Sequence, residues 1–133
     1  MKTFLDSGVL LSAWRRGELH NHAVSVLQDE THEFFTSDAV KLELLPKPAF
    51  EKRPLETQFY NQYFDIALAC ESLSSELADE ALALAKKHGL AAMDALHLAS
   101  AIRQGADEFI TSELPGKPMF RLKELKVTSL YSL

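Results

Sequence analysis

Short apolar runs alternate with segments of helical periodicity along the whole chain, and this alternation limits the folds that the chain can adopt. Residues 3–5 form a run with β-favouring Thr and Phe, and a segment with apolar side chains three and four positions apart follows it. Strands that alternate with helices usually pair in parallel and carry helices on the sheet faces, so we predict an α/β domain. Further strands are expected at 33–36, toward the end of 66–71, at 109–111 and at 127–130.

Capping residues and helix breakers mark where the predicted helices begin and end. Ser7 is suited to cap the first helix and Gly17 to end it, and apolar spacing predicts a second helix over 19–27. A short third helix is expected to begin at Ser37 or Asp38 and to close at Pro46 and Pro48. The next helix should run from Pro54, and its inward residues are Leu55, Phe59, Tyr63 and Ile66.

Two further helices are expected. One runs from Ser74 or Ser75 to Gly89, with Ala78, Ala81, Leu82 and Ala85 facing inward, and the last covers 92–103.

The length of 133 residues is that of one domain, and we expect a single domain over 1–133. Apolar residues make up 47% of the chain, but no run approaches the roughly 18 apolar residues of a membrane span. Asp6 interrupts the apolar N-terminal stretch, which argues against a signal peptide. The single Cys70 lies in the apolar sequence ALAC and is expected to be a buried, inert thiol, which fits a reducing cytoplasm.

Four acidic residues lie at the ends of the expected elements. Asp6 and Glu113 follow predicted strands, Asp94 opens a helix, and Glu43 lies in the short helix beyond the second strand. In an open parallel sheet, ligands bind outside the carboxyl ends of the strands, where the strand order reverses. Four carboxylates crowded there would repel one another unless a cation neutralised them, and oxygen-only ligands suit Mg²⁺ or Mn²⁺. The pattern predicts a divalent-metal site.

A plainer interpretation applies to each acid taken singly. The chain has 19 acidic residues, most acidic side chains face solvent, and Asp6 could simply cap a helix. The surroundings of Asp94 favour a functional role, because its neighbours in sequence are apolar and an isolated buried charge would cost several kcal/mol without a partner. The set of four is therefore more informative than any of its members.

The formal net charge of −5 excludes a generally basic nucleic-acid-binding surface. Part of this acidity belongs to the four candidate ligands, so bound cations and a local basic patch could still attract a nucleic acid. Basic residues near Glu43 offer such phosphate contacts, with Phe50 available to stack on a base; a solvated loop is an equally good interpretation. These basic residues are Lys41, Lys47, Lys52 and Arg53.

Histidines give a weaker signal. His97 follows Asp94 by three positions on the same helical face, so it could support a metal ligand, act as a ligand itself, or pack beside the site for structural reasons, the last being favoured. His20 and His22 lie on opposite faces of a helix and have no cysteine partner, so no zinc site is expected from them.

The chain resembles the PIN domain family, and specifically the small VapC-type ribonucleases that act as toxins in prokaryotic toxin–antitoxin pairs. The resemblance spans nearly the whole chain and rests on three segments, FLDSGVLLSAW, FFTSDAVKLELL and the most specific one, HGLAAMDALHLASAIRQGADEFITSE. It implies a three-layer α/β/α fold with a short central parallel sheet. It also implies roles for six residues: Asp6, Glu43 and Asp94 as the core metal-binding acids, Glu113 as the fourth, and Ser7 and Thr111 as polar neighbours that orient ligands or water.

The resemblance implies an activity and partners as well. The expected reaction is Mg²⁺- or Mn²⁺-dependent hydrolysis of RNA to leave a 5′-phosphate and a 3′-hydroxyl, and the expected partners are RNA, a small antitoxin protein and a second copy of the chain. The chain departs from the family pattern at two positions. It has Glu113 where Asp is commoner, and Gly8 where Asn or Ser is commoner.

Two other interpretations fit parts of the sequence. Phosphatases of the haloacid dehalogenase type also begin with a strand that ends in Asp, but they carry a second Asp two positions later, where this chain has Gly8. A PIN-like module with an impaired metal site could instead act only by docking a partner protein. Metal binding distinguishes that module from a nuclease.

Overall fold

Five parallel strands form the centre of the protein in a computed structural model that describes residues 1–133. The strand order is β3-β2-β1-β4-β5, and every neighbouring pair is parallel. The alternation of strand and helix in the sequence therefore predicted the sheet type correctly. The strands are β1 (Lys2–Leu5), β2 (Glu33–Ser37), β3 (Ala69–Glu71), β4 (Glu108–Thr111) and β5 (Lys126–Ser129).

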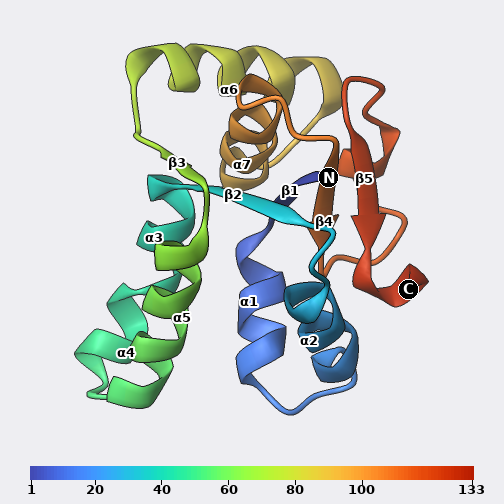
Figure 1. Ribbon diagram of the computed structural model, residues 1–133. Helices are drawn as coiled ribbons and strands as arrows, with labels where there is room; N and C mark the ends of the chain where they lie inside the picture. Colours follow the sequence, from blue (N-terminus) through green and yellow to red (C-terminus); the bar gives the residue numbers. More distant parts are fainter.

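Helices cover both faces of the sheet because the chain adds strands first on one side of β1 and then on the other side. From β1 the chain moves outward through β2 to β3, and it then returns to β4 on the other side of β1. Right-handed crossovers made in opposite directions place their helices on opposite faces. Figure 1 shows α1 to α5 below the sheet and α6 and α7 above it, which confirms the three-layer α/β/α fold. The helices are α1 (Ser7–Trp14), α2 (His20–Gln28), α3 (Asp38–Leu44), α4 (Pro46–Phe50), α5 (Pro54–Ile66), α6 (Ser75–His88) and α7 (Ala92–Arg103), with 3₁₀ turns η1 (Pro118–Arg121) and η2 (Leu130–Ser132).

The hydrophobic core lies where the two central strands meet the helices. Phe4 and Phe109 occupy paired positions on β1 and β4, and their rings stack with centroids 5.7 Å apart. Leu10 from α1 and Leu98 from α7 are fully buried against this centre. Full burial of such a side chain stabilises the fold by roughly 1.5–3 kcal/mol. The packing therefore fixes the positions of β1 and β4, and with them the carboxyl ends of these two strands.

Helix α6 begins and ends as the sequence predicts, but it buries a different face. The Ser74 hydroxyl accepts the N–H of Leu77 at 3.1 Å, and Gly89 ends the helix with a left-handed φ of +70°. The buried face is rotated from the predicted one: Ala81 is buried and Ala85 is partly buried as predicted, but Ala78 and Leu82 are exposed, and Leu77 and Leu84 are buried instead. Two leucines bury more apolar area than the alanines on the predicted face, which fixes the rotation of the helix.

The buried face of α5 is likewise rotated from the predicted one. Tyr63 is buried and Phe59 is partly buried as predicted, but Leu55 is 69% exposed and Ile66 is 62% exposed. Tyr60 and Glu56 are buried on the neighbouring face. Tyr60 donates a hydrogen bond of 2.7 Å to the Glu56 carboxylate. Because each polar group satisfies the other, the pair can be buried without an unpaired charge.

Three local predictions need correction. Pro46 begins α4 rather than closing α3, because proline is tolerated at a first helical position. Asp6, and not Ser7, is the residue that precedes α1. Cys70 is exposed, not buried, because β3 is an edge strand and lacks a covering neighbour on one side. Partial desolvation and then a hydrogen bond to Asp38 raise the pKa of this thiol, so it stays protonated.

None of the helices has the length and apolar character that a membrane crossing requires.

Candidate metal centre

Asp6 lies at the point where the strand order reverses, directly between β1 and α1. Its backbone N–H donates to the carbonyl of Ile110 on β4 at 2.9 Å, which ties it to the neighbouring strand. Thr111, the last residue of β4, donates its hydroxyl hydrogen to Asp6 Oδ2 at 2.8 Å. Asp6 is only 7% exposed, so its carboxylate is fixed in place at the carboxyl edge of the sheet.

Glu43 reaches the same edge from α3. Its Oε1 atom accepts the Ser7 hydroxyl at 2.8 Å and His97 Nε2–H at 2.5 Å. These bonds leave Oε2 free, and the bond from His97 followed by that from Ser7 lowers the pKa of the Glu43 carboxyl despite its partial burial. Glu43 is therefore ionised and held in one orientation.

His97 completes a compact group with these two acids. Its Nε2 lies 3.9 Å from Asp6 Oδ1, and one donor atom from each of Asp6, Glu43 and His97 lies within 4.8 Å of the others. The ring is buried and its Nδ1 has no partner. The Glu43 carboxylate accepts hydrogen bonds, so Nε2 carries the proton of this contact.

Asp94 enters the site from the first turn of α7. It is partly buried, and burial together with the charges of Asp6, Glu113 and Glu43 raises the pKa of its carboxyl. Only His97 opposes this shift. The four predicted acids therefore lie near enough to repel one another, although Asp94 and Glu113 stand outside the tight group formed with His97.

The segment after β4 brings Glu113 to the site and explains the glycine at position 8. The Glu113 N–H donates to the Thr111 hydroxyl at 3.2 Å, and the Glu113 carbonyl accepts the Ser129 hydroxyl at 2.6 Å. A Cβ atom at Gly8 would come within 2.1 Å of the Ser112 Oγ atom. Helix α1 and this segment therefore approach closely, and a larger residue at position 8 would require the Ser112 side chain to move.

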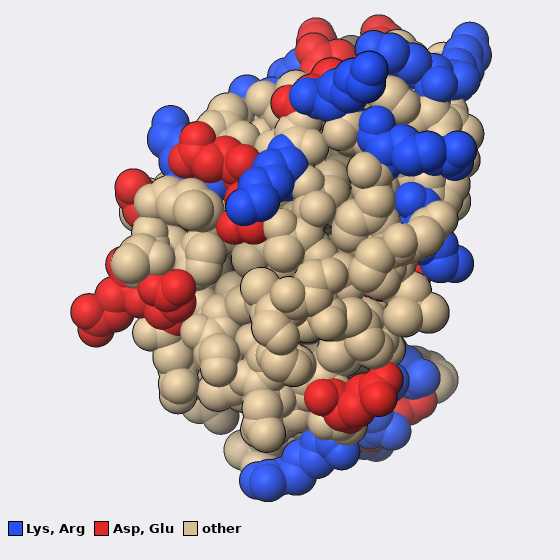
Figure 2. Space-filling model, turned by 90° about the vertical axis from the view of Figure 1, so that its right-hand side faces the viewer, with Lys and Arg blue, Asp and Glu red and all other residues tan.

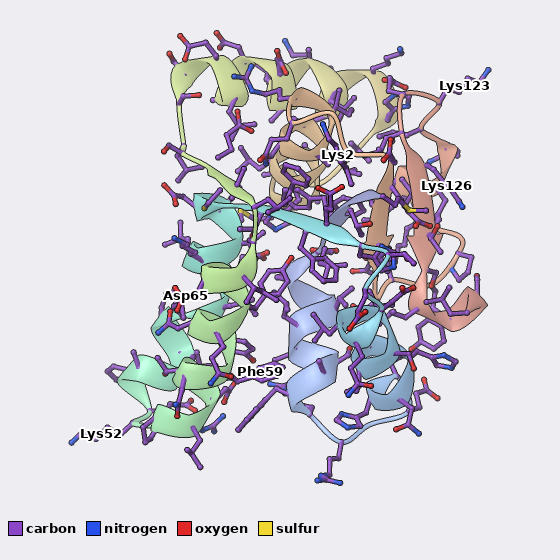
Figure 3. All side chains as sticks on the ribbon, viewed as in Figure 1. Lys2, Lys52, Phe59, Asp65, Lys123 and Lys126 are labelled. Carbon is purple, nitrogen blue, oxygen red and sulfur yellow. The ribbon has the colours of Figure 1, made fainter.

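A groove of about 270 Å³ opens directly beside the acids, between α1 and the α3–α5 segment. The structure separates the four basic residues that the sequence groups together. Lys47 and Arg53 line the groove. Lys41 lies outside it, with its ammonium 5.6 Å from the centre of the Phe64 ring. Lys52 lies on the turn before α5 and points away from the protein (Figure 3). Phe50 is almost fully exposed and does not line the groove.

Sequence reasoning missed one basic residue of the groove, Arg15. Ser7, Leu11 and Arg15 all line it, and their spacing of four residues places them on one face of α1. That spacing was visible in the sequence, but it acquires meaning only once α1 is known to border the site.

The residues of the centre fit a hard divalent cation. Carboxylate oxygens from Asp6, Glu43, Asp94 and Glu113 are the donors that Mg²⁺ and Mn²⁺ prefer. The closest basic side chain is His97, and no Lys or Arg lies within 4.0 Å of any of the four acids. Such a group can hold a metal and a water molecule at the sheet edge.

Comparison with known proteins agrees with this architecture. The model of the PIN domain matches residues 3–113. No curated protein matches the chain. The fold is similar to VapBC2 from Rickettsia felis bound to a promoter DNA fragment, with a TM-score of 0.72 and 15% identity over 97% of this chain and 98% of that chain. It is similar to a toxin–antitoxin complex from Klebsiella pneumoniae, with a TM-score of 0.72 and 18% identity over 97% of this chain and 98% of that chain. It is also similar to VapBC-1 from nontypeable Haemophilus influenzae, with a TM-score of 0.66 and 15% identity over 98% of this chain and 99% of that chain. Since the family match covers most of the sequence and the fold agrees over its full length, this chain belongs to the PIN domain family.

Proposed function

We propose that the protein is a metal-dependent endoribonuclease and the toxin of a toxin–antitoxin pair. One observation carries the proposal: Asp94 lies with three other carboxylates at the carboxyl edge of the sheet, where burial and then their charges raise its pKa. Carboxylates kept together without a Lys or Arg partner favour the binding of a cation. PIN domains are generally nucleases, which supports hydrolysis of a nucleic acid as the reaction.

The proposed ligands are Asp6, Glu43, Asp94 and Glu113, with Mg²⁺ or Mn²⁺ as the metal. When bound, the cation would activate water and stabilise the charge that develops on the phosphate. The protein's own groups fix the geometry: Thr111 orients Asp6, and Ser7 and His97 orient Glu43. His97 is thus a positioning residue in this proposal, because its Nε2–H is already engaged with Glu43.

The bond changes follow from hydrolysis of an RNA phosphodiester. The water oxygen forms a bond to phosphorus, the bond between phosphorus and the 3′ oxygen breaks, and the leaving oxygen gains a proton. The products carry a 5′-phosphate and a 3′-hydroxyl. No covalent bond to the protein forms, so no nucleophilic side chain is needed at the site.

The proposed partners are RNA, a small antitoxin and a second copy of this chain. The similar solved structures include toxin–antitoxin complexes, which supports the antitoxin partner. The dimer rests on the resemblance to VapC-type toxins alone. Sedimentation of the isolated protein and of its complex with a co-expressed antitoxin tests both.

Isothermal titration of Mn²⁺, followed by an RNA cleavage assay in the same buffer, tests the nuclease. Wild-type protein should bind Mn²⁺ and cleave RNA, and Asp6→Asn/Asp94→Asn should lose both. Asp65→Asn/Asp79→Asn is the matched control, because it removes the same charge from exposed positions on α5 and α6 and should retain both activities. Failure of the wild-type protein to bind metal would instead favour the module that only docks a partner protein.

A further inference from the structure

The groove beside the metal centre contains two basic side chains that no acid neutralises. Arg15 comes from the end of α1 and Lys47 from α4, and both line the groove. Neither has a carboxylate within 4.0 Å, whereas Arg53 in the same groove pairs with Glu51 at 2.6 Å and with Glu56 at 3.5 Å. Arg15 and Lys47 therefore keep their full charge available for a ligand.

The groove and the metal centre are continuous. Ser7 and Glu43 belong to both, since they line the groove and share the hydrogen bond that orients the Glu43 carboxylate. Arg15 lies eight residues beyond Ser7 along α1, which corresponds to about 12 Å at a helical rise of 1.5 Å per residue. A strand with one phosphate at the acids would therefore place a phosphate one or two positions along the chain among Arg15 and Lys47.

We infer that Arg15 and Lys47 bind an RNA phosphate that flanks the bond to be cut, and that the groove takes a single RNA strand. The inference rests on the proposed nuclease function and adds the path of its substrate. The groove volume of about 270 Å³ is just below the range of ligand pockets, so it suits a short segment of single strand. Leu11 provides an apolar patch on the same wall for a ribose or base.

The charge distribution elsewhere supports this choice of surface. Figure 2 shows the face on the β5 side with an uncharged centre, while its Lys and Arg side chains gather toward the rims. The net charge of −5 also makes non-specific attraction of RNA weak over the whole molecule. Attraction must then come from a few cations placed beside the site, together with the bound metal.

The salt dependence of RNA binding distinguishes this path from the loop residues suggested by sequence. A fluorescein-labelled single-stranded RNA of mixed sequence is titrated with protein in EDTA, so that no cleavage occurs, over a series of salt concentrations. For Arg15→Ala/Lys47→Ala the affinity should fall about tenfold, and the slope of log K against log[salt] should lose about 1.4 for two phosphate contacts on a single strand. Lys41→Ala/Lys52→Ala should retain the wild-type slope.

A distant pair controls for net charge. Lys86 on α6 and Lys123 after η1 are exposed and have no acid within 4.0 Å at their ammonium groups, and Lys123 lies at the other end of the molecule from Lys52 (Figure 3). Lys86→Ala/Lys123→Ala should change the slope little. An equal change of slope in this pair and in Arg15→Ala/Lys47→Ala would overturn the inference. Arg15→Gln and Lys47→Gln, tested singly, replace the double variant if it does not fold.

The binding assay in EDTA and the cleavage assay in Mn²⁺ can fail separately. If wild-type protein cleaves RNA but Arg15→Ala/Lys47→Ala binds it with an unchanged slope, the inference is wrong and the nuclease stands. If the slope falls as expected but wild-type protein does not cleave any RNA, the groove binds RNA and the proposed nuclease is wrong.

Discussion

Two clusters of acids in this protein differ in what neutralises them. Beside β3, the Glu71 carboxylate accepts hydrogen bonds from Arg103 at 2.6 Å and from the buried Ser100 hydroxyl at 2.7 Å, and Arg103 also donates to Glu80 at 2.9 Å. Hydrogen bonds to the two acids raise the pKa of the Arg103 guanidinium. This cluster carries its own cation and joins β3, α6 and α7.

The metal centre has the same type of side chain without such a partner. Burial and the charges of three neighbouring carboxylates raise the pKa of Asp94, and only His97 lowers it. Repulsion of this kind reduces the stability of the folded state, so it persists where another requirement maintains it. The comparison indicates that the Glu71 cluster supports structure, whereas the Asp94 cluster has the properties expected of the proposed metal site.

The largest expected effect is on cleavage. Asp94→Asn removes a charged oxygen from the proposed metal site, and we expect RNA cleavage to fall by about 10³-fold or more, the scale set by loss of electrostatic stabilisation of a transition state. The variant should give the wild-type circular dichroism spectrum. A product-release assay on labelled RNA in Mn²⁺ measures the rate, and undiminished activity would refute the assignment.

The cluster beside β3 should respond in stability and not in cleavage. Glu71→Ala leaves the Ser100 hydroxyl and Arg103 without their shared acceptor, which should cost about 1–3 kcal/mol in the free energy of unfolding. Urea unfolding at pH 7 measures this loss. Glu30→Ala is the control, since Glu30 is exposed and lies outside the cluster, and such surface changes usually stay within about 0.5 kcal/mol. A Glu71→Ala protein of wild-type stability that lost cleavage would reverse the comparison.

A smaller effect is expected from the histidine that orients Glu43. His97→Leu removes the N–H that holds Glu43 Oε1, and loss of a group that orients a metal ligand typically weakens metal affinity by about 10–100-fold. His97→Gln keeps an N–H donor on a side chain of similar reach and should recover part of the Mn²⁺ affinity measured by calorimetry. Equal affinities in the two variants, with both folded, would show that His97 only fills space.

The sequence predicted the parallel sheet and the four acids because both depend on local signals. The ends of β1 and β4 place Asp6 and Glu113 at one edge, and the first turn of α7 places Asp94 there, whatever the details of packing. The contact between His97 and Glu43 depends on how α3 and α7 lie against each other, and no pattern within either segment specifies that arrangement. The sequence could thus predict that these four acids gather at one edge but not their geometry, and their role as a metal site stays a prediction.

The mistaken details have a common cause in tertiary packing. The inward face of α6 was predicted around Leu82, but the helix offered a competing face with Leu77 and Leu84 that buries more apolar area. Cys70 was predicted to be buried because its neighbours are apolar, and the exposed edge position of β3 follows from strand order, which its sequence does not encode locally. Periodicity identifies an element but leaves its rotation and its neighbours open.

The smallest expected effect is the pH dependence of stability without metal. In EDTA, folding raises the pKa of Asp94 above its ordinary value of 3.8, so the folded state binds more protons than the unfolded state between these two pKa values. Wild-type stability should therefore fall as pH rises through that window. Asp94→Asn carries no charge there, and it should match the wild type below the window and exceed it in Tm at pH 7.

A pH series of thermal unfolding curves tests this sign, with Glu71→Gln as the matched amide substitution in the other cluster. Glu71→Gln loses the charge that pairs with Arg103, so its Tm at pH 7 should fall where that of Asp94→Asn rises. Saturating Mn²⁺ should reverse the order of wild type and Asp94→Asn, because a ligand that binds only the folded state at 100 times its Kd adds about 2.7 kcal/mol. An Asp94→Asn protein less stable than wild type in EDTA would mean that the carboxylates are not repelling one another, and the reason for placing a cation among them would be lost.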